Sequence, residues 1–226
     1  MTTLYACQQE TIRLDGYEVH GIDVSRYQGK VNWEKVIAQN IDFVFIKATE
    51  GESLIDAQFI NNWQQLSKLK VRKGAYHFFR PTVSSIEQAK HFSEVVKMDF
   101  GDLPPVLDIE VTDGVSKSTL INAAKSWVAI VESNFGIKPI IYTSQKFYNT
   151  YLEGHFDDYP LWIARYNNYA EPAINGKNQW SFWQYGNRGR IEGIEGDVDF
   201  NVFKGNTLEL DNLIAQPPAV SFIETK

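Results

Sequence analysis

The chain has 226 residues, of which 43% are hydrophobic and 14% aromatic, so it is long enough to bury the core of one globular domain. Its formal net charge is −6 and its 22 Lys and Arg residues are scattered, which argues against a nucleic-acid partner. No apolar run in the sequence is long enough to span a membrane. The single cysteine, Cys7, excludes an internal disulfide and a cysteine-based metal site.

We divide the chain into an N-terminal extension (1–19), one catalytic barrel domain (20–213) and a C-terminal tail (214–226). Within the extension, Leu4-Tyr-Ala-Cys7 resembles a bacterial lipoprotein processing box, which would put a lipid anchor on Cys7. However, the residues before Cys7 contain neither a positively charged start nor an apolar run. Two interpretations remain open: a remnant of a signal segment, or a chance match in a disordered start.

From residue 20 the sequence alternates between short apolar strands and amphipathic helices. Strands are predicted at 20–25, 42–48, 74–79, 106–109 and 139–143. Helices are predicted at 33–40, 57–69, 84–96 and 118–135, with a short helix through Phe147 and Tyr151. Asn32 is placed to cap the first helix, and Ser84 with Glu87 forms a capping box for the third. Repeated strand–helix units with apolar strands predict a parallel sheet covered by helices.

The pattern changes after residue 160. Strands are predicted at 161–166, 180–185 and 197–200, but the segment 167–178 has no helical period and a Gly-rich connection joins the last two strands. Eight strands, of which only the first five have proper helices, predict an α/β fold: a modified TIM-type barrel with five βα units followed by three strands with little helix. An open doubly wound sheet is the alternative, but no Gly-x-Gly-x-x-Gly follows the first strand.

The strand at 106–109 delivers two acidic residues. Asp108 and Glu110 are two residues apart, so in an extended strand they point to the same face. Two adjacent carboxylates cannot both ionise cheaply, so we expect one pKa to rise and the other to stay low, with the charge of Asp108 raising the pKa of Glu110. The pair suits acid–base catalysis, although ordinary salt bridges at a strand end would use the same residues.

In a barrel of this type the chemistry lies at the carboxyl ends of the strands. Carboxylates and aromatic side chains are expected to meet there, with a few other polar groups: Asp23, Ser25, Gln28, Lys47, Glu50, Tyr76, Asp108, Glu110, Tyr142, Trp162, Arg165 or Tyr166, Trp183, Gln184, Tyr185, Asp197 and Asp199. Aromatic faces beside carboxylates are typical of a sugar site, because pyranose rings stack on Trp and Tyr. Core positions for Trp162 and Trp183 are the alternative. His77 is one residue out of phase with Tyr76 and is predicted to be a core histidine facing the helices.

Six ordered motifs between about His20 and Phe203 resemble glycoside hydrolase family 25, the Chalaropsis-type lysozymes. They are Asp23-Val-Ser-Arg-Tyr-Gln28, Phe45-Ile-Lys-Ala-Thr-Glu-Gly51, Gly74-Ala-Tyr-His-Phe-Phe79, Asp108-Ile-Glu110, Trp183-Gln-Tyr185 and Asp197-Val-Asp-Phe-Asn201. The resemblance implies a modified barrel and N-acetylmuramidase activity, which cuts the β-1,4 bond between N-acetylmuramic acid and N-acetylglucosamine in peptidoglycan.

The resemblance also implies roles for individual residues. Glu110 matches the general acid, and Asp108, Asp23 and Asp199 match the other acidic residues of the active centre. Tyr76, Tyr142, Trp183 and Gln184 match positions that line the sugar groove. With the strand-end residues added, the predicted substrate-binding set is Tyr76, Tyr142, Trp183, Gln184, Tyr185, Gln28, Lys47 and Trp162.

The expected reaction needs no metal or cofactor. The anomeric carbon could be attacked by a carboxylate, by water, or by the substrate's own N-acetyl oxygen with Asp108 orienting the amide; the Asp-x-Glu spacing favours the last route. Two rival functions are a metal-dependent phosphoesterase, for which paired histidine ligands are missing, and a non-catalytic peptidoglycan-binding protein, which would predict loss of Glu110 or Asp108. The expected partner is peptidoglycan, the expected state a monomer, and the expected location extracytoplasmic, either secreted or associated with the cell envelope.

Overall fold

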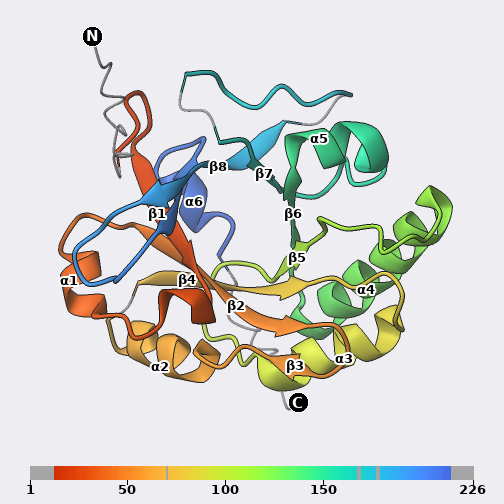
Figure 1. The fold of residues 1–226 in the computed structure, drawn as a ribbon, viewed down its shortest axis with the longest axis horizontal. Helices are drawn as coiled ribbons and strands as arrows, with labels where there is room; N and C mark the ends of the chain where they lie inside the picture. The colour runs from red at the N-terminus through yellow and green to blue at the C-terminus, as the bar shows by residue number, and fades with distance from the viewer. Residues whose placement is uncertain (1–12, 70, 167–168, 177–178, 215–226) are drawn as a thin grey trace, which may run out of the picture.

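The computed structural model describes residues 13–69, 71–166, 169–176 and 179–214 (Figure 1). The proposed lipid anchor at Cys7 and nearly all of the predicted tail lie outside the described residues. Within the described ranges, no helix is both long and apolar enough to cross a membrane.

Eight strands close into a barrel. They are β1 (Val19–Val24), β2 (Phe43–Glu50), β4 (Arg72–Phe78), β5 (Val106–Asp108), β6 (Ile140–Ser144), β7 (Leu161–Ala164), β8 (Trp180–Gly189) and β9 (Val198–Phe203). Their order is β1-β9-β8-β7-β6-β5-β4-β2, and a β1–β2 pairing completes the ring. The unpredicted two-residue strand β3 (Leu54–Ile55) pairs with the end of β2. The predicted α/β barrel is confirmed.

The last strand runs in the opposite direction to the others. Among the eight barrel strands, neighbours pair in parallel except at β9, which pairs antiparallel with both β8 and β1. The short strand β3, outside the ring, is also antiparallel to its partner β2. The amino end of β9 therefore lies beside the carboxyl ends of the other strands. Asp199 was predicted at a carboxyl end. It reaches the same rim from the amino half of β9, directly opposite Asp23.

Helices cover the outside of the barrel on the side of the first five strand–helix units (Figure 1). They are α1 (Trp33–Ile37), α2 (Phe59–Leu69), α3 (Ser85–Val95), α4 (Lys117–Phe135) and α5 (Gln145–Phe147), which continues into a π-helical turn (Tyr148–Leu152). Asn32 and Ser84 accept hydrogen bonds from the backbone N–H groups of Lys35 and Glu87, at their predicted capping positions. The predicted capping box is only half formed, because the Glu87 side chain accepts from Lys90. A short helix, α6 (Thr207–Asp211), was not predicted.

The inward side chains of the barrel change from apolar to polar towards one rim. On β2 the alternating inward positions are Phe43, Phe45 and Lys47, and on β9, read against its direction, they are Phe203, Asn201 and Asp199. The apolar inward residues form one buried cluster: Val19, Phe43, Phe45, Leu103, Val106, Ile140, Trp162, Phe182 and Phe203 among others. This cluster is a packed floor on which the polar rim rests.

Histidine 77 lies in the outer layer, as its phase predicted. Its side chain is fully buried, bonded to Thr49 at 2.7 Å and Gln88 at 3.1 Å, and stacked on the Trp127 ring at 5.5 Å. Burial lowers the pKa of His77 to about 3. The core interpretation of His77 is confirmed.

The described chain already packs on the barrel before residue 20. The ring of Tyr17 lies 6.0 Å from that of Trp180 and 6.1 Å from that of Trp183, and its hydroxyl donates to Glu171 at 2.7 Å. Part of the predicted extension, residues 13–18, therefore belongs to the outer surface of the barrel.

Candidate active site

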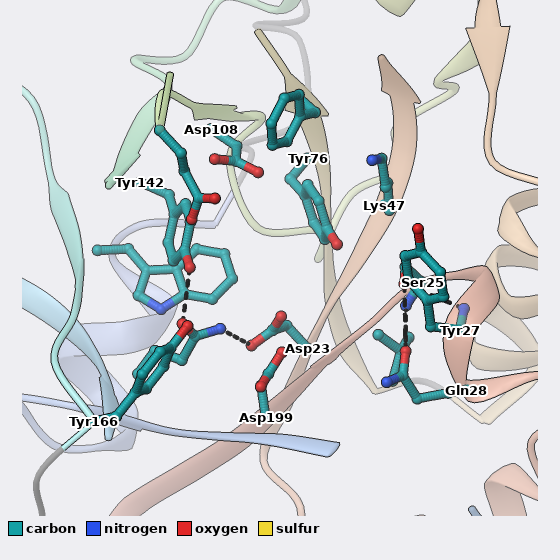
Figure 2. A pocket seen from close by; sticks show the side chains of 15 residues that line it. Asp23, Ser25, Tyr27, Gln28, Lys47, Tyr76, Asp108, Tyr142, Tyr166 and Asp199 are labelled. Carbon is teal, nitrogen blue, oxygen red and sulfur yellow. Dashed lines mark hydrogen bonds between the residues drawn. The ribbon is translucent and has the colours of Figure 1, made fainter. Parts of the chain in front are cut away.

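A pocket opens at the polar rim of the barrel (Figure 2). Its lining comes from the ends of most of the strands: Asp23, Val24, Ser25, Tyr27, Gln28, Lys47, Tyr76, Phe78, Asp108, Glu110, Tyr142, Trp162, Tyr166, Gln184 and Asp199. All four predicted acids are present. Of the predicted substrate-binding residues, the pocket brings together Tyr76, Tyr142, Gln184, Gln28, Lys47 and Trp162.

Trp183 and Tyr185 do not line the pocket, contrary to the prediction. Strand residues alternate between faces, so with Gln184 pointing inward its two neighbours must point outward. Both are buried in the layer outside the strands, and the Trp183 indole N–H donates to the backbone oxygen of Arg165 at 2.9 Å. Trp183 and Tyr185 therefore belong to the hydrophobic core outside the barrel strands.

Three aromatic residues of the pocket were not in the predicted substrate-binding set: Tyr27, Phe78 and Tyr166. Tyr27 lies on the 3₁₀ turn η1 (Arg26–Gln28) and is 77% exposed, and Tyr166 follows β7 and is 53% exposed. Tyr27 stands inside the first sequence motif and Tyr166 was one of two alternatives after strand 161–166, so both signals were available. Figure 2 shows Tyr166 and Tyr27 on opposite sides of Asp23 and Asp199.

The turn that carries Tyr27 is fixed by polar contacts. Ser25 caps it, and the Gln28 side chain accepts the Ser25 backbone N–H at 2.9 Å. The Gln28 amide also donates to the backbone oxygen of Asp197 at 3.0 Å. These bonds join the loop after β1 to the loop before β9, so both walls of the pocket are held in one position.

Asp108 ends β5 and is 4% exposed. Its Oδ1 is buried and has no hydrogen-bond partner among the described residues. Burial, followed by the charge of Glu110, raises the pKa of Asp108 well above its ordinary value. A buried carboxyl oxygen without a donor is costly, so this atom is available to a polar group of a ligand.

Glu110 lies two residues further along and is exposed at the mouth of the pocket. Partial desolvation of the carboxyl group by the surrounding protein raises the pKa of Glu110, while a hydrogen bond with Tyr142 and the charge of Lys47 lower it. The pKa values of both acids are therefore raised, which differs from the expectation that one would stay low. The charge of Glu110 contributes to the rise of the Asp108 pKa.

Asp23 and Asp199 form a second acidic pair across the β1–β9 ladder. Asp23 is 5% exposed, and burial raises its pKa to about 6 although hydrogen bonds from Asn201 and Gln184 oppose the rise. The two amide groups donate to the same oxygen, Asp23 Oδ2, at 2.7 Å and 2.8 Å. Asn201 is the last residue of a motif quoted above, but it was not among the predicted site residues.

Among the described residues that line the pocket, Lys47 is the single cation. Its ammonium bonds Glu50 at 2.7 Å and lies 4.8 Å from the centre of the Phe78 ring. Its charge lowers the pKa of both Asp108 and Glu110, so it offsets part of the repulsion in the cluster. Within the described chain, no group of three or more His, Cys, Asp and Glu side chains is arranged to hold a metal ion.

Such a site can donate and accept protons around a polar ligand that also presents apolar faces. Four carboxyl groups with different burial provide acids and bases, and the aromatic side chains provide stacking surfaces. A sugar polymer has both properties.

Comparisons with known proteins agree with this chemistry. Residues 22–194 match the family described as Glycosyl hydrolases family 25. The chain is 43% identical to "Uncharacterized protein YegX" of Escherichia coli strain K12 (88% of this chain, 74% of the relative). It is 34% identical to "Lysozyme M1" of Streptomyces globisporus (85% of this chain, 70% of the relative). The solved family 25 glycosyl hydrolase from Bacillus anthracis superposes with a TM-score of 0.83 at 34% identity, covering 88% of this chain and 95% of that one.

Proposed function

The chain belongs to glycosyl hydrolases family 25, and from this membership we propose that it is a lysozyme-type N-acetylmuramidase. Its substrate is peptidoglycan, and the bond cut is the β-1,4 link between N-acetylmuramic acid and N-acetylglucosamine. The observation that carries the proposal is the Asp108–Glu110 pair at the end of β5. One carboxyl is buried with an unpartnered oxygen and the other is exposed at the mouth of an acid-lined, aromatic-lined pocket.

In the proposed reaction Glu110 is the general acid. It donates its proton to the glycosidic oxygen as the bond from that oxygen to the anomeric carbon breaks, and the N-acetylglucosamine side of the chain departs as an alcohol. Its exposure at the pocket mouth lets it reach a bond that lies across the rim. Its raised pKa keeps a larger fraction protonated near neutral pH.

Asp108 orients the N-acetyl group of the muramic acid unit. The acetamido carbonyl oxygen attacks the anomeric carbon, and the amide N–H gives the buried Asp108 Oδ1 a donor, which no described residue supplies. Water then attacks the same carbon, and ionised Glu110 accepts its proton, which restores the starting state of the enzyme. The overall product is a new N-acetylmuramic acid reducing end.

The aromatic side chains hold the glycan strand across the acids. Tyr166 and Tyr27 stand at opposite sides of the pocket with more than half of each residue exposed, which suits stacking on successive sugar rings (Figure 2). Tyr76 and Tyr142 are more deeply placed and shape the space next to Asp108. Since its substrate is cell-wall material, we also propose that the protein works outside the cytoplasm, as a monomer.

The test is digestion of purified peptidoglycan by the wild type and by Glu110→Gln, with the new ends identified by mass spectrometry after reduction. New N-acetylmuramic acid ends that disappear in the variant support both the bond and the acid. New N-acetylglucosamine ends would overturn the bond assignment. Binding without any cleavage by the wild type, across several wall types, would favour a non-catalytic wall-binding protein.

A further inference from the structure

One oxygen of Asp23 is enclosed by amide donors. Asn201 Nδ2 donates to Asp23 Oδ2 at 2.7 Å, and Gln184 Nε2 donates to the same atom at 2.8 Å. Both amide side chains are buried, with exposures of 0% and 2%. Asn201 and Gln184 are cross-strand partners on β9 and β8, so the two donors approach Asp23 from adjacent strands.

Each amide makes a second bond at its other end, and for Asn201 this bond fixes the orientation. The Trp162 indole N–H donates to Asn201 Oδ1 at 2.8 Å, and the Tyr142 hydroxyl donates to Gln184 Oε1 at 2.8 Å. An indole N–H can only donate, so the Asn201 carbonyl must face Trp162 and its NH₂ group must face Asp23. Trp162 is itself held by stacking on Phe45 at 4.5 Å.

An oxygen that already accepts two N–H groups cannot also carry a proton, because the added hydrogen would meet the donors. Oδ1 is then the only oxygen of Asp23 able to hold one. We infer that Asn201, oriented by Trp162, is a positioning residue for Asp23. Its N–H donation favours the ionised form of this acid, and when Asp23 is protonated its proton is confined to Oδ1. The catalytic meaning of this role rests on the proposed function, but the placement of the proton does not.

The consequence concerns the acidic cluster as a whole. Asp23 is hydrogen-bonded to Asp199, its partner across the β1–β9 ladder, and this bond also favours the ionised form of Asp23. The titratable groups that face Asp23 around the pocket are Lys47, Tyr76, Asp108, Glu110, Tyr142, Tyr166 and Asp199. Without the Asn201 donor, Asp23 would keep its proton to a higher pH and the cluster would carry less negative charge near neutrality.

The experiment follows the protonation of Asp23 itself. The ¹³Cγ signal of Asp23, assigned by its absence in Asp23→Asn, is titrated in the wild type, in Asn201→Leu and in Trp162→Phe. We expect a wild-type midpoint at about 6 and a rise on the order of one pH unit in Asn201→Leu. Trp162→Phe, which keeps an aromatic ring but frees the amide to rotate, should shift the midpoint less in the same direction. In a peptidoglycan assay, the acidic limb of the pH profile of kcat/KM should move to higher pH together with the Asp23 midpoint.

The chain offers a matched control. Asn62, on α2, is a fully buried asparagine whose Oδ1 accepts the Trp33 indole N–H at 3.2 Å, but it does not line the pocket. Asn62→Leu should cost stability and leave the Asp23 midpoint unchanged. An unchanged midpoint in Asn201→Leu, or an equal shift in Asn62→Leu, overturns the inference. If Asn201→Leu does not fold, an unchanged midpoint in Trp162→Phe overturns it alone. Because the ¹³C titration needs no turnover, absence of cleavage would count against the proposed function and not against this inference.

Discussion

Asp108 and Glu110 are two residues apart in sequence, but their surroundings differ. Asp108 is enclosed at the end of β5, and its Oδ1 has no hydrogen-bond partner in the described part of the chain, whereas Glu110 reaches the mouth of the pocket. A group that must meet the bridging oxygen between two sugars has to stand at the mouth, and a group that holds a substituent of one ring can lie deeper. The depth of each carboxyl therefore divides the roles that the proposed reaction needs.

This division predicts different responses to the leaving group. Glu110→Gln should lower kcat on peptidoglycan by about 10²–10⁴-fold, the usual worth of a general acid, but much less on an aryl glycoside of N-acetylated sugar whose leaving group needs no proton. Asp108→Asn should lower kcat on both substrates, because the N-acetyl group must be oriented in either case. Steady-state kinetics of the two variants on the two substrates is the measurement. Equal losses for Glu110→Gln on both would remove its role as acid.

The exposed tyrosine after β7 gives a second prediction at this scale. Tyr166→Ala should raise KM several-fold and leave kcat within a few-fold of the wild type, because it removes a stacking surface and no reacting group. Phe100, 71% exposed and outside this pocket, is the matched control, and Phe100→Ala should change neither constant. A fall in kcat with unchanged KM would show that Tyr166 acts in the chemical step.

At the scale of elements, residue types and strand phase predicted most of the site, and the errors have physical causes. Trp183 and Tyr185 were assigned to the pocket together with Gln184. Successive side chains of a strand point to opposite faces, so when Gln184 faces the pocket its two neighbours cannot. The direction of β9 was also readable: the predicted connection 186–196 is shorter than the dozen or more residues that a crossover between parallel strands needs. The bond from Asn201 to Asp23 links positions 178 residues apart, and nothing local in the sequence indicates it.

Gly74 on β4 is closely packed against the aromatic floor of the barrel. A Cβ on Gly74 would lie 2.6 Å from two ring atoms of Phe45, and the Phe45 ring stacks on Trp162. Gly74→Ala should therefore lower the free energy of unfolding by about 1–3 kcal/mol through overpacking. In urea unfolding, a double variant with Phe45→Leu should cost less than the sum of the single variants, because the smaller side chain makes room. Additive costs would mean that the ring moves aside without strain.

At the scale of the whole molecule, the barrel gathers four carboxyl groups at one rim and buries two of them. Such a cluster is unfavourable for folding near neutral pH, since burial and mutual repulsion both penalise the ionised forms. The packed aromatic floor and the closed ring of strands hold the acids together despite this cost. Removing a charge from the cluster should then stabilise the fold while impairing the reaction.

The variant Asp108→Asn tests whether removing one charge from the cluster stabilises the fold. The folded pKa of Asp108 lies well above its ordinary value of 3.8, so the stability linked to its proton is fully present below about pH 4 and is lost as the pH rises through the folded pKa. The variant needs no proton, so by urea unfolding it should match the wild type at about pH 4 and exceed it by about 1–3 kcal/mol at about pH 8.

Asp211→Asn is the control for Asp108→Asn, because its effect on stability should have the opposite sign. Asp211 pairs with Arg72, with an N–O distance of 2.6 Å, and this contact lowers the pKa of Asp211. Its stabilising effect is therefore present above the ordinary pKa and is lost as the pH falls, so Asp211→Asn should be the less stable protein at about pH 8 and equal to the wild type in acid. If Asp108→Asn were destabilised at every pH, a hydrogen bond donated by the protonated Asp108 would have to outweigh the cost of its buried charge, and the unpartnered oxygen could no longer be assigned to the substrate.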